Sequence, residues 1–271
     1  PIEMAANIWD MRTRRRAAQM VGRPGLGIYD TTSSAESTAV IIAAAREEFG
    51  ALKRDGLCCA AIAELKVDFE RMKKAAFLLE SDHTIGALYG PLMGGYAGGP
   101  EGTMITLIAH HFLGLLAFNA EFHCSFPIDI HQSSNTSAEM LWLSSVYSQA
   151  LSRNTHLINL NCAMAAAGPS TEMLFYEMAN HAMQSAVSGA QFDAGGIARD
   201  KYPERTSTLE IRMGAEVAHI VARMGMSRND VNEIVKKILL KYEKEIPNAP
   251  LGKKFSECYD LERVTPRKEY L

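Results

Sequence analysis

The feature that most constrains the fold of this chain is a regular alternation of short apolar segments with longer amphipathic ones. The short segments have the composition of buried strands and lie at residues 57–63, 84–89, 126–131 and 157–162. The longer segments carry apolar residues at helical spacing and lie at residues 35–53, 64–80, 103–120, 138–151, 173–188, 208–224 and 229–243. This alternation predicts a parallel sheet whose strands are joined by helical crossovers.

The same pattern favours a barrel over an open, doubly wound sheet. Strands and helices are regularly spaced, and no Gly-x-Gly-x-x-Gly fingerprint opens a strand–helix unit. Only about five such units are evident, whereas a closed barrel has eight. We therefore predict an α/β fold of the TIM (β/α)8 type that lacks its N-terminal strands. Residues 1–271 would form a single barrel domain, with residues 246–271 as an extended C-terminal tail.

Composition and charge argue against several classes of protein. Of the 271 residues 47% are apolar and 22% are charged, and the formal net charge is −3. This balance gives no basis for a nucleic-acid or anionic-membrane surface, and no apolar run reaches the ~20 residues of a membrane span. The five cysteines form no Cys-x-x-Cys pair, so neither a disulfide framework nor a structural zinc site is expected. We expect a cytoplasmic protein, and a start at Pro1 indicates a fragment or a processed chain.

A glycine-rich turn precedes the first strand. In the stretch Gly-Arg-Pro-Gly-Leu-Gly-Ile-Tyr, residues 22–29, three glycines and a proline form a tight turn and the last residues form a short strand. Thr and Ser at residues 31–34 then provide N-caps for the next helix. Tyr29 ends the strand, which is where parallel α/β folds place their chemistry. A phosphate site is disfavoured, because the glycines precede the strand instead of linking strand to helix.

Several further blocks, taken with this stretch, carry a resemblance to a known family. They are Glu64-Leu65-Lys66-Val67-Asp68, Gly94-Gly95-Tyr96-Ala97-Gly98-Gly99, Ser134-Asn135-Thr136, Ala167-Gly168-Pro169-Ser170-Thr171-Glu172-Met173, Ala249-Pro250-Leu251-Gly252-Lys253, and Glu257-Cys258-Tyr259-Asp260 with Val264-Thr265-Pro266 and Glu269-Tyr270. In content and order they resemble the archaeal monomethylamine methyltransferases, and they span nearly the whole chain. That family has a long N-terminal part before this region, in agreement with the missing strands.

The resemblance implies a TIM barrel whose mouth holds a methylated amine. It also implies a methyltransferase of methanogenesis that passes the methyl group to the Co(I) of a separate corrinoid protein. The corrinoid would then belong to the partner, and the chain itself would bind no cofactor and no metal. The glycine-rich loop at residues 94–102 is the candidate surface for close approach of the corrinoid. We further expect a homo-oligomer.

The residues at the family's catalytic positions differ in this chain. In the family a pyrrolysine imine holds the amine, with two acidic residues and a glutamine around it. Tyr29 stands at the pyrrolysine position, and a phenol has no electrophilic imine with which to form an adduct. The acidic positions fall at Cys58 and Leu88, and the glutamine falls at Cys162. None of these four residues keeps the family's chemistry, and a buried Cys is usually a small hydrophobe.

Three residues are candidates for contact with the substrate. Tyr29 is the leading one, because an aromatic face attracts a methylated ammonium by a cation–π interaction worth about 1–2 kcal/mol when desolvated. Its alternative is a core or interface tyrosine. Tyr89 ends another strand and could form a second wall, although packing beneath the 94–102 loop is the stronger interpretation. His131, at a strand end, suits an acid–base or amine-binding role, with a hydrogen-bonded structural histidine as the stronger alternative.

Two functions remain open, with a weaker third. The first is demethylation of a methylated amine, monomethylamine-like or quaternary, toward a corrinoid protein. A quaternary ammonium suits a site without an imine, because its positive nitrogen already activates the methyl group. The second is a non-catalytic relative that keeps only the docking surface for the corrinoid protein. The third, a barrel lyase or isomerase acting on a phosphorylated substrate, would need a Lys or carboxylate at a strand end, and no Lys is found there.

Overall fold

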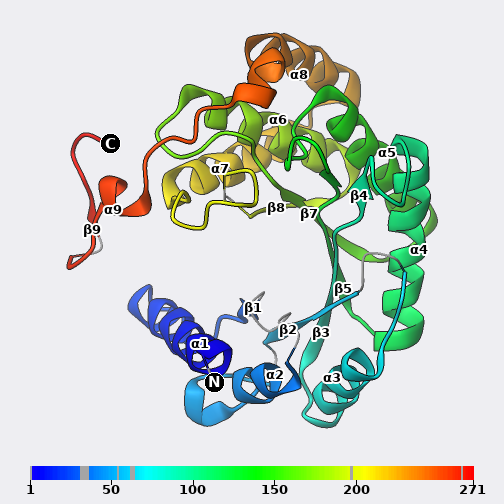
Figure 1. The fold of residues 1–271 in the computed structure, drawn as a ribbon, viewed down its shortest axis with the longest axis vertical. Helices are drawn as coiled ribbons and strands as arrows, with labels where there is room; N and C mark the ends of the chain where they lie inside the picture. The colour runs from blue at the N-terminus through cyan, green and yellow to red at the C-terminus, as the bar shows by residue number, and fades with distance from the viewer. Residues whose placement is uncertain (1, 31–36, 54, 62–64, 196–197, 264) are drawn as a thin grey trace. The chain divides into compact units, whose positions relative to one another are not determined.

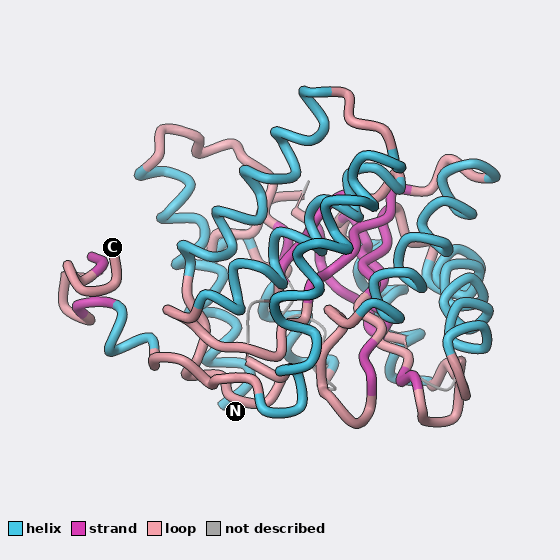
Figure 2. The backbone as a smooth tube through the Cα atoms, turned by 90° about the horizontal axis from the view of Figure 1, so that it is seen from above, coloured by secondary structure: helices cyan, strands magenta, loops and turns pink. Residues whose placement is uncertain are grey.

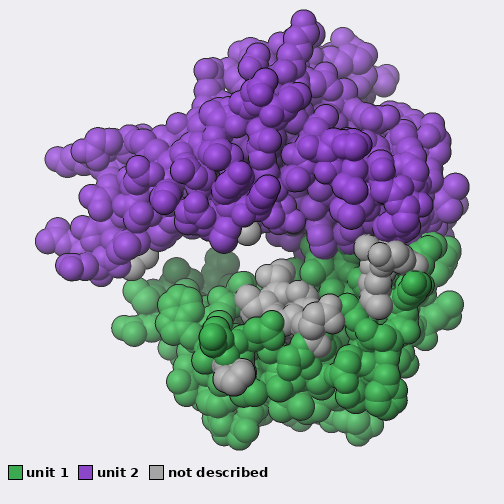
Figure 3. All heavy atoms as spheres, in the orientation of Figure 1, with its two compact units in different colours: residues 1–89, 109–124 green, residues 90–108, 125–271 purple. Residues whose placement is uncertain are grey.

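The fold is that of a computed structural model, which describes residues 2–30, 37–53, 55–61, 65–195, 198–263 and 265–271 (Figure 1). Strands and helices alternate along these residues, as the sequence predicts. The N-caps expected at residues 31–34 and the start of the predicted helix at Glu64 lie outside the described residues. The chain divides into two compact units, coloured in Figure 3: unit 1 holds Pro1–Tyr89 and Ala109–Cys124, and unit 2 holds Gly90–Ile108 and Ser125–Leu271.

Unit 1 builds a parallel sheet from strands in the order β1-β2-β3-β5. The register places Tyr29 opposite Gly56 and Cys58 opposite Gly86, so these four residues share one face of the sheet. The elements of this unit are α1 (Ile2–Met20), β1 (Tyr29–Asp30), α2 (Thr38–Ala44), the 3-10 helix η2 (Glu47–Phe49), β2 (Gly56–Ala60), α3 (Phe69–Glu80), β3 (Thr84–Tyr89), the second half of α4 (Pro100–Phe118) and most of β5 (Phe122–Ser125).

The opposite face of the same sheet carries the core of unit 1. Leu57, Cys59, Ile85, Ala87 and Tyr89 alternate with the residues named above and are all buried. They pack with buried apolar side chains of the helices into one hydrophobic cluster. Because neighbouring residues of a strand point to opposite faces, this arrangement decides which side chains are available to a site.

Two helices of unit 1 begin or end at other residues than the sequence predicts. The helix expected at 64–80 starts only at Phe69, because the Asp68 carboxylate accepts the backbone N–H of Arg71 and caps it there. The helix expected at 35–53 is α2, which ends at Ala44, followed by the separate η2. An extended Arg46 and a left-handed Gly50 interrupt the helical path.

Unit 2 contains two small groups of parallel strands and most of the helices. β7 (Ile158–Ala163) pairs with β8 (Gln191–Ala194), and β4 (Leu92–Met93) pairs with β6 (Ile128–Asp129). The central helix is α6 (Glu172–Ser188), which packs against α5 (Ala138–Asn154), α7 (Thr208–Met224) and α8 (Arg228–Tyr242). Their shared core is rich in small residues and methionines, with Ala163, Met178 and Met183 buried within it.

The C-terminal segment is folded, so the expectation of an extended tail at 246–271 is wrong. It contains the 3-10 helix η3 (Glu243–Asn248), the short helix α9 (Phe255–Cys258) and an antiparallel pair of β9 (Tyr259–Asp260) with β10 (Thr265–Pro266), visible beside the C-terminus in Figure 2. Two tyrosines hold this segment to the start of α7. Tyr259 bonds the hydroxyl of Thr208, and Tyr270 donates to the Glu210 carboxylate over 2.6 Å.

The strand predicted at 126–131 is also corrected. Only Ile128–Asp129 forms a strand there, and the strand β5 lies earlier in the chain. Among the described residues, α4 is the helix with the length and apolar character that a membrane span needs, a property it shares with core helices of soluble proteins.

Candidate functional site

The segment that leads into Tyr29 is fixed by one buried arginine. Arg15 of α1 is 7% exposed, and its guanidinium donates to the carbonyl oxygens of Pro24 and Leu26 at 3.2 and 2.8 Å. It also donates to the carbonyl oxygen of Gly50 at 2.8 Å. These hydrogen bonds tie the glycine-rich turn to α1. This arrangement sets where β1, and with it Tyr29, enters the sheet.

The charge of this arginine is balanced by a fully buried carboxylate. Asp55 lies 2.5 Å from the Arg15 guanidinium, and it also accepts the backbone N–H groups of Ile28 and Leu52 at 2.8 and 2.7 Å. A buried ion pair is tolerated when its remaining hydrogen-bonding sites are satisfied, as they are here. One carboxylate thus ties together α1, the residue before Tyr29 and the start of β2.

Tyr29 and Cys58 meet on the sheet face opposite the helices. The Cys58 thiol donates to the Tyr29 hydroxyl oxygen, with 2.9 Å between sulfur and oxygen. Cys58 is fully buried, whereas Tyr29 is partly exposed. The ring of Phe122 lies 5.0 Å from the Tyr29 ring, with 77° between their planes, in an edge-to-face contact. Phe122 is a member of this group that the sequence analysis did not select.

Two glycines form the surface on which these rings lie. A Cβ on Gly86 would stand 2.4 Å from the Phe122 ring and 3.1 Å from the Tyr29 ring. A Cβ on Gly56 would stand 2.7 Å from Phe122. Both distances to Phe122 are shorter than side-chain contacts permit, so the aromatic pair requires glycine at these two positions of β2 and β3. Leu88, two residues after Gly86, is partly exposed and lies on the same face.

Tyr89 occupies the opposite, helix-covered face and is fully buried. Its hydroxyl is 2.8 Å from Nδ1 of His123, and its ring contacts those of His110 and His111 at centroid distances of 5.3 and 5.1 Å. This position does not suit a wall of a substrate pocket. The packing interpretation holds for Tyr89, but its neighbours are histidines of α4 and β5 instead of the 94–102 loop.

Two of the histidines beside Tyr89, His111 and His123, are held neutral by burial. Burial lowers the pKa of His111 to about 3, with further contributions from His123 and His110, and lowers the pKa of His123 to about 4. Burial also raises the pKa of the Tyr89 phenol well above its usual range. Near neutral pH Tyr89, His111 and His123 are therefore uncharged parts of the core of unit 1.

In unit 2, His131 lies in the turn after β6 and is exposed. Its backbone N–H donates to the Asp129 carboxylate at 2.8 Å, and a Cβ on Gly94 would lie 3.5 Å from its ring nitrogen Nε2. It thus stands beside the start of the glycine-rich loop. Tyr29, Cys58 and Leu88 belong to unit 1, whereas His131 and Cys162 belong to unit 2.

Cys162 lies on β7 directly opposite Asp193 of β8. Cys162 is 5% exposed, and its sulfur lies within 4.8 Å of the Asp193 carboxylate. The side-chain amide of Asn135 donates to the Cys162 carbonyl at 2.8 Å, so the Ser134-Asn135-Thr136 block sets the end of β7. Asp193 is not among the site residues predicted from the sequence, although an acidic residue in a short strand was the available signal. It adds a carboxylate next to Cys162.

The loop after β7 is held by a second buried carboxylate. Glu177 of α6 accepts the backbone N–H groups of Ala166 and Ala167 at 2.8 and 2.9 Å, and the Thr136 hydroxyl at 2.5 Å. Burial raises the pKa of this carboxyl, although its three donors act in the opposite direction. Glu177 therefore acts as a structural acceptor that positions the loop.

Close backbone contact explains two of the blocks that the sequence analysis singled out. The N–H of Gly168 donates to the Pro250 carbonyl at 2.9 Å, and a Cβ on Gly168 would stand 1.8 Å from the carbonyl oxygen of Leu251. Gly252 has φ +65° and its own Cβ would stand 2.2 Å from the Pro169 carbonyl oxygen. Only glycine fits where these two chain segments meet.

The family model and the curated relatives that match this chain all point to one family. The family model described as monomethylamine methyltransferase MtmB matches residues 1–271. Monomethylamine methyltransferase MtmB3 of Methanosarcina barkeri (strain Fusaro) is 32% identical over 272 residues, and MtmB1 of Methanosarcina acetivorans is 31% identical over the same length. Each alignment covers 100% of this chain and 58% of the relative, so the chain spans somewhat more than half the length of these proteins.

Two solved structures share the fold. The crystal structure of the Methanosarcina barkeri monomethylamine methyltransferase aligns with a TM-score of 0.92 at 32% identity, covering 100% of this chain and 58% of that one. The crystal structure of its hydroxylamine complex aligns with a TM-score of 0.91 at the same identity and coverage. This similarity confirms the predicted fold class, an α/β fold of the TIM-barrel type.

Proposed function

Because the chain belongs to the monomethylamine methyltransferase MtmB family, we propose that the protein containing it moves a methyl group from a methylated amine to the cobalt of a corrinoid protein. The match of the family model over residues 1–271 carries this proposal. The corrinoid would be held by the partner protein, and no cofactor is assigned to this chain. The residues around Tyr29 suggest which class of methylated amine would be the substrate.

The aromatic pair supports a quaternary or highly methylated ammonium as the substrate. Tyr29 and Phe122 offer two rings in edge-to-face contact, and Cys58 contributes a thiol beside them. A quaternary ammonium donates no N–H hydrogen bond and is bound well by aromatic faces. None of these interactions needs an imine.

The chemistry of such a substrate needs no covalent adduct with the protein. The methyl carbon leaves nitrogen and binds cobalt, and the electron pair of the broken C–N bond stays on nitrogen, which departs as a neutral amine. The cobalt(I) centre supplies the pair for the new bond. The protein would contribute by binding and orienting the ammonium, because a positioned reactant reacts faster than a free one.

The test uses the full-length protein with a corrinoid protein reduced to Co(I). Mono-, di- and trimethylamine and tetramethylammonium are offered one at a time, and the visible spectrum of the corrinoid is followed. Methylation with tetramethylammonium or trimethylamine supports the aromatic-site proposal. Methylation with monomethylamine alone would keep the methyltransferase activity and overturn the substrate assignment.

A second candidate function is a non-catalytic relative that only docks the corrinoid protein. It is favoured by the burial of the two thiols: Cys58 is fully buried and Cys162 is 5% exposed, as expected for packing residues. This candidate predicts measurable binding of the corrinoid protein, for example by sedimentation, without methylation by any of the amines. Turnover with one amine would exclude it.

We also propose that the protein is a cytoplasmic homo-oligomer. Three apolar residues of α4 support association, since Ile105, Phe112 and Leu116 are 71%, 51% and 89% exposed. Apolar side chains gathered on one helix are typical of surfaces that are covered in an assembly. Sedimentation of the full-length protein tests this, and a monomer at micromolar concentration would contradict it.

A further inference from the structure

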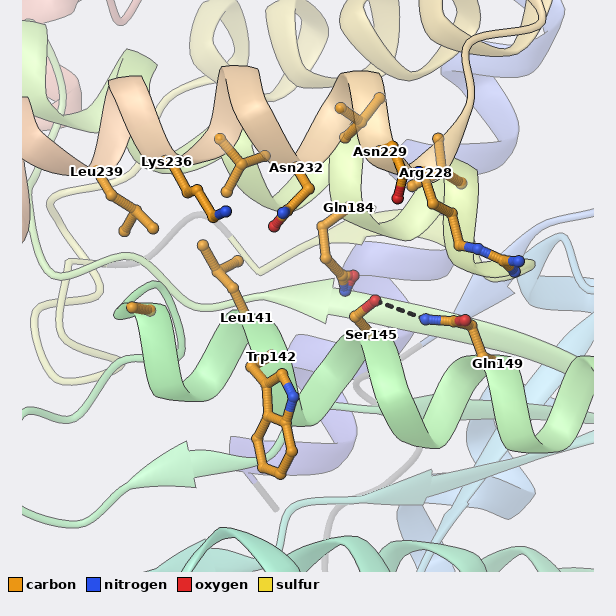
Figure 4. Close-up of a pocket in the computed structure, with 14 residues that line it drawn as sticks. Leu141, Trp142, Ser145, Gln149, Gln184, Arg228, Asn229, Asn232, Lys236 and Leu239 are labelled. Carbon is orange, nitrogen blue, oxygen red and sulfur yellow. Dashed lines mark hydrogen bonds between the residues drawn. The ribbon is translucent and has the colours of Figure 1, made fainter.

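A groove on the helical layer of unit 2 has the features of a ligand site, independently of the function proposed above. It lies between α5 and α8, with α6 as its floor, and encloses about 430 Å³ (Figure 4). This volume falls within the range of small-molecule sites. Its walls include Leu141 of α5 and Val235 of α8, so a large part of the surface is apolar.

The strongest evidence for a ligand is the side chain of Gln184 on the floor. Gln184 is 5% exposed, and neither its amide nitrogen nor its amide oxygen has a hydrogen-bond partner in the described part of the chain. Figure 4 shows this side chain extending from α6 into the groove between the other two helices. A buried, unpaired amide is unfavourable, and a partner that offers both a donor and an acceptor would relieve that cost.

The charge of the groove indicates an anionic ligand. Arg228 and Lys236 of α8 both line it, and no acidic side chain is among its lining residues in the described chain. No ion pair is recorded for Arg228 within the described residues, whereas Lys236 contacts the exposed Glu233 at 3.1 Å. The guanidinium of Arg228 is suited to a phosphate, to which it can donate two parallel hydrogen bonds.

The groove therefore combines an unpaired donor and acceptor on Gln184, apolar walls and a cationic end at Arg228. A glutamine carboxamide pairs with an adenine edge through two hydrogen bonds, one in each direction. We propose that this groove binds a nucleoside monophosphate, with the base on Gln184 between the apolar walls and the phosphate at Arg228, which lies at one end of the groove (Figure 4). Adenine is the base that the geometry favours.

The direct test is titration calorimetry of the full-length protein with AMP, GMP, CMP and UMP in turn, and with adenosine and inorganic phosphate as partial ligands. We expect AMP to bind most tightly, and adenosine and phosphate each to bind at least about tenfold more weakly, because each lacks one of the two contacts. If no monophosphate binds at millimolar concentration, the proposal is wrong. If phosphate and AMP bind with equal affinity, the groove recognises only the anion, and the assignment of the base to Gln184 is wrong.

Two variants separate binding from folding. Gln184→Leu removes the unpaired amide, so we expect the free protein to melt at the same or a higher temperature while AMP no longer raises that temperature. Arg228→Ala should weaken AMP binding by roughly ten- to a hundredfold. Arg223→Ala, an exposed arginine of α7 outside the groove, is the matched control and should leave binding unchanged. Unchanged AMP binding in both Gln184→Leu and Arg228→Ala would overturn the proposal.

Discussion

Replacing Arg15 by methionine should be among the most destabilising single changes in unit 1. Methionine fills a similar volume but donates no hydrogen bond, so the fully buried Asp55 keeps only its two backbone donors and loses its counter-charge. Removing one partner of a buried ion pair typically costs about 3–5 kcal/mol. The carbonyls of Pro24, Leu26 and Gly50 lose their donor in the same step. Against a total stability of about 5–15 kcal/mol, this loss is large.

The measurement is denaturant unfolding of the full-length protein, compared with two other variants. Arg212→Ala removes an arginine from an exposed pair with Glu216 and should change the unfolding free energy by less than about 0.5 kcal/mol. The double variant Arg15→Met/Asp55→Leu should recover part of the loss, because the unpaired charge is then gone. A loss below about 1 kcal/mol for Arg15→Met would refute the claim that this arginine fixes the segment before Tyr29.

Three further changes have defined outcomes. Gly86→Ala places a methyl group 2.4 Å from Phe122 and should cost about 1–3 kcal/mol in thermal unfolding, partly restored by Phe122→Leu. Gly168→Ala meets the Leu251 carbonyl oxygen and should make the C-terminal segment more sensitive to limited proteolysis; an unchanged digestion pattern would contradict the close contact. His123 is neutral when folded, so stability should fall as pH drops from about 6.5 to 4, by up to about 1.4 kcal/mol per unit, and less steeply in His123→Asn.

The fold class was accessible from the sequence because alternation of strands and helices is a long-range pattern. β3 was predicted with its observed bounds, and so was α7. Each of these two segments has one hydrophobic periodicity throughout, and the periodicity stops clearly at both ends. The C-terminal segment was not predicted, because its structure depends on hydrogen bonds from Tyr259 and Tyr270 to residues of α7 that are distant in sequence.

The strand β5 shows why part of the site was missed. Its helix-covered face carries His123 instead of an apolar residue, so the segment lacks the apolar run of a buried strand. Once β5 is placed, Phe122 falls next to Tyr29. The role of Tyr89 could not be predicted for a similar reason. A place at the end of a strand predicts where a residue lies along the sheet, but it does not predict which face of the sheet the ring occupies. Family resemblance supplied the candidates Tyr29, Cys58 and Cys162, and their roles remain predictions.

The proposed function places methyl transfer from a methylated ammonium to a corrinoid protein at an aromatic site built on Tyr29. The most direct measurement is a single turnover with tetramethylammonium and Co(I) corrinoid protein, comparing the wild type with Tyr29→Leu and with the control Tyr176→Leu, which changes a partly buried tyrosine of α6 in unit 2. We expect methylation by the wild type and the control, and a rate about tenfold lower for Tyr29→Leu, which corresponds to losing about 1–2 kcal/mol of cation–π attraction. Methylation at the same rate in Tyr29→Leu would contradict it.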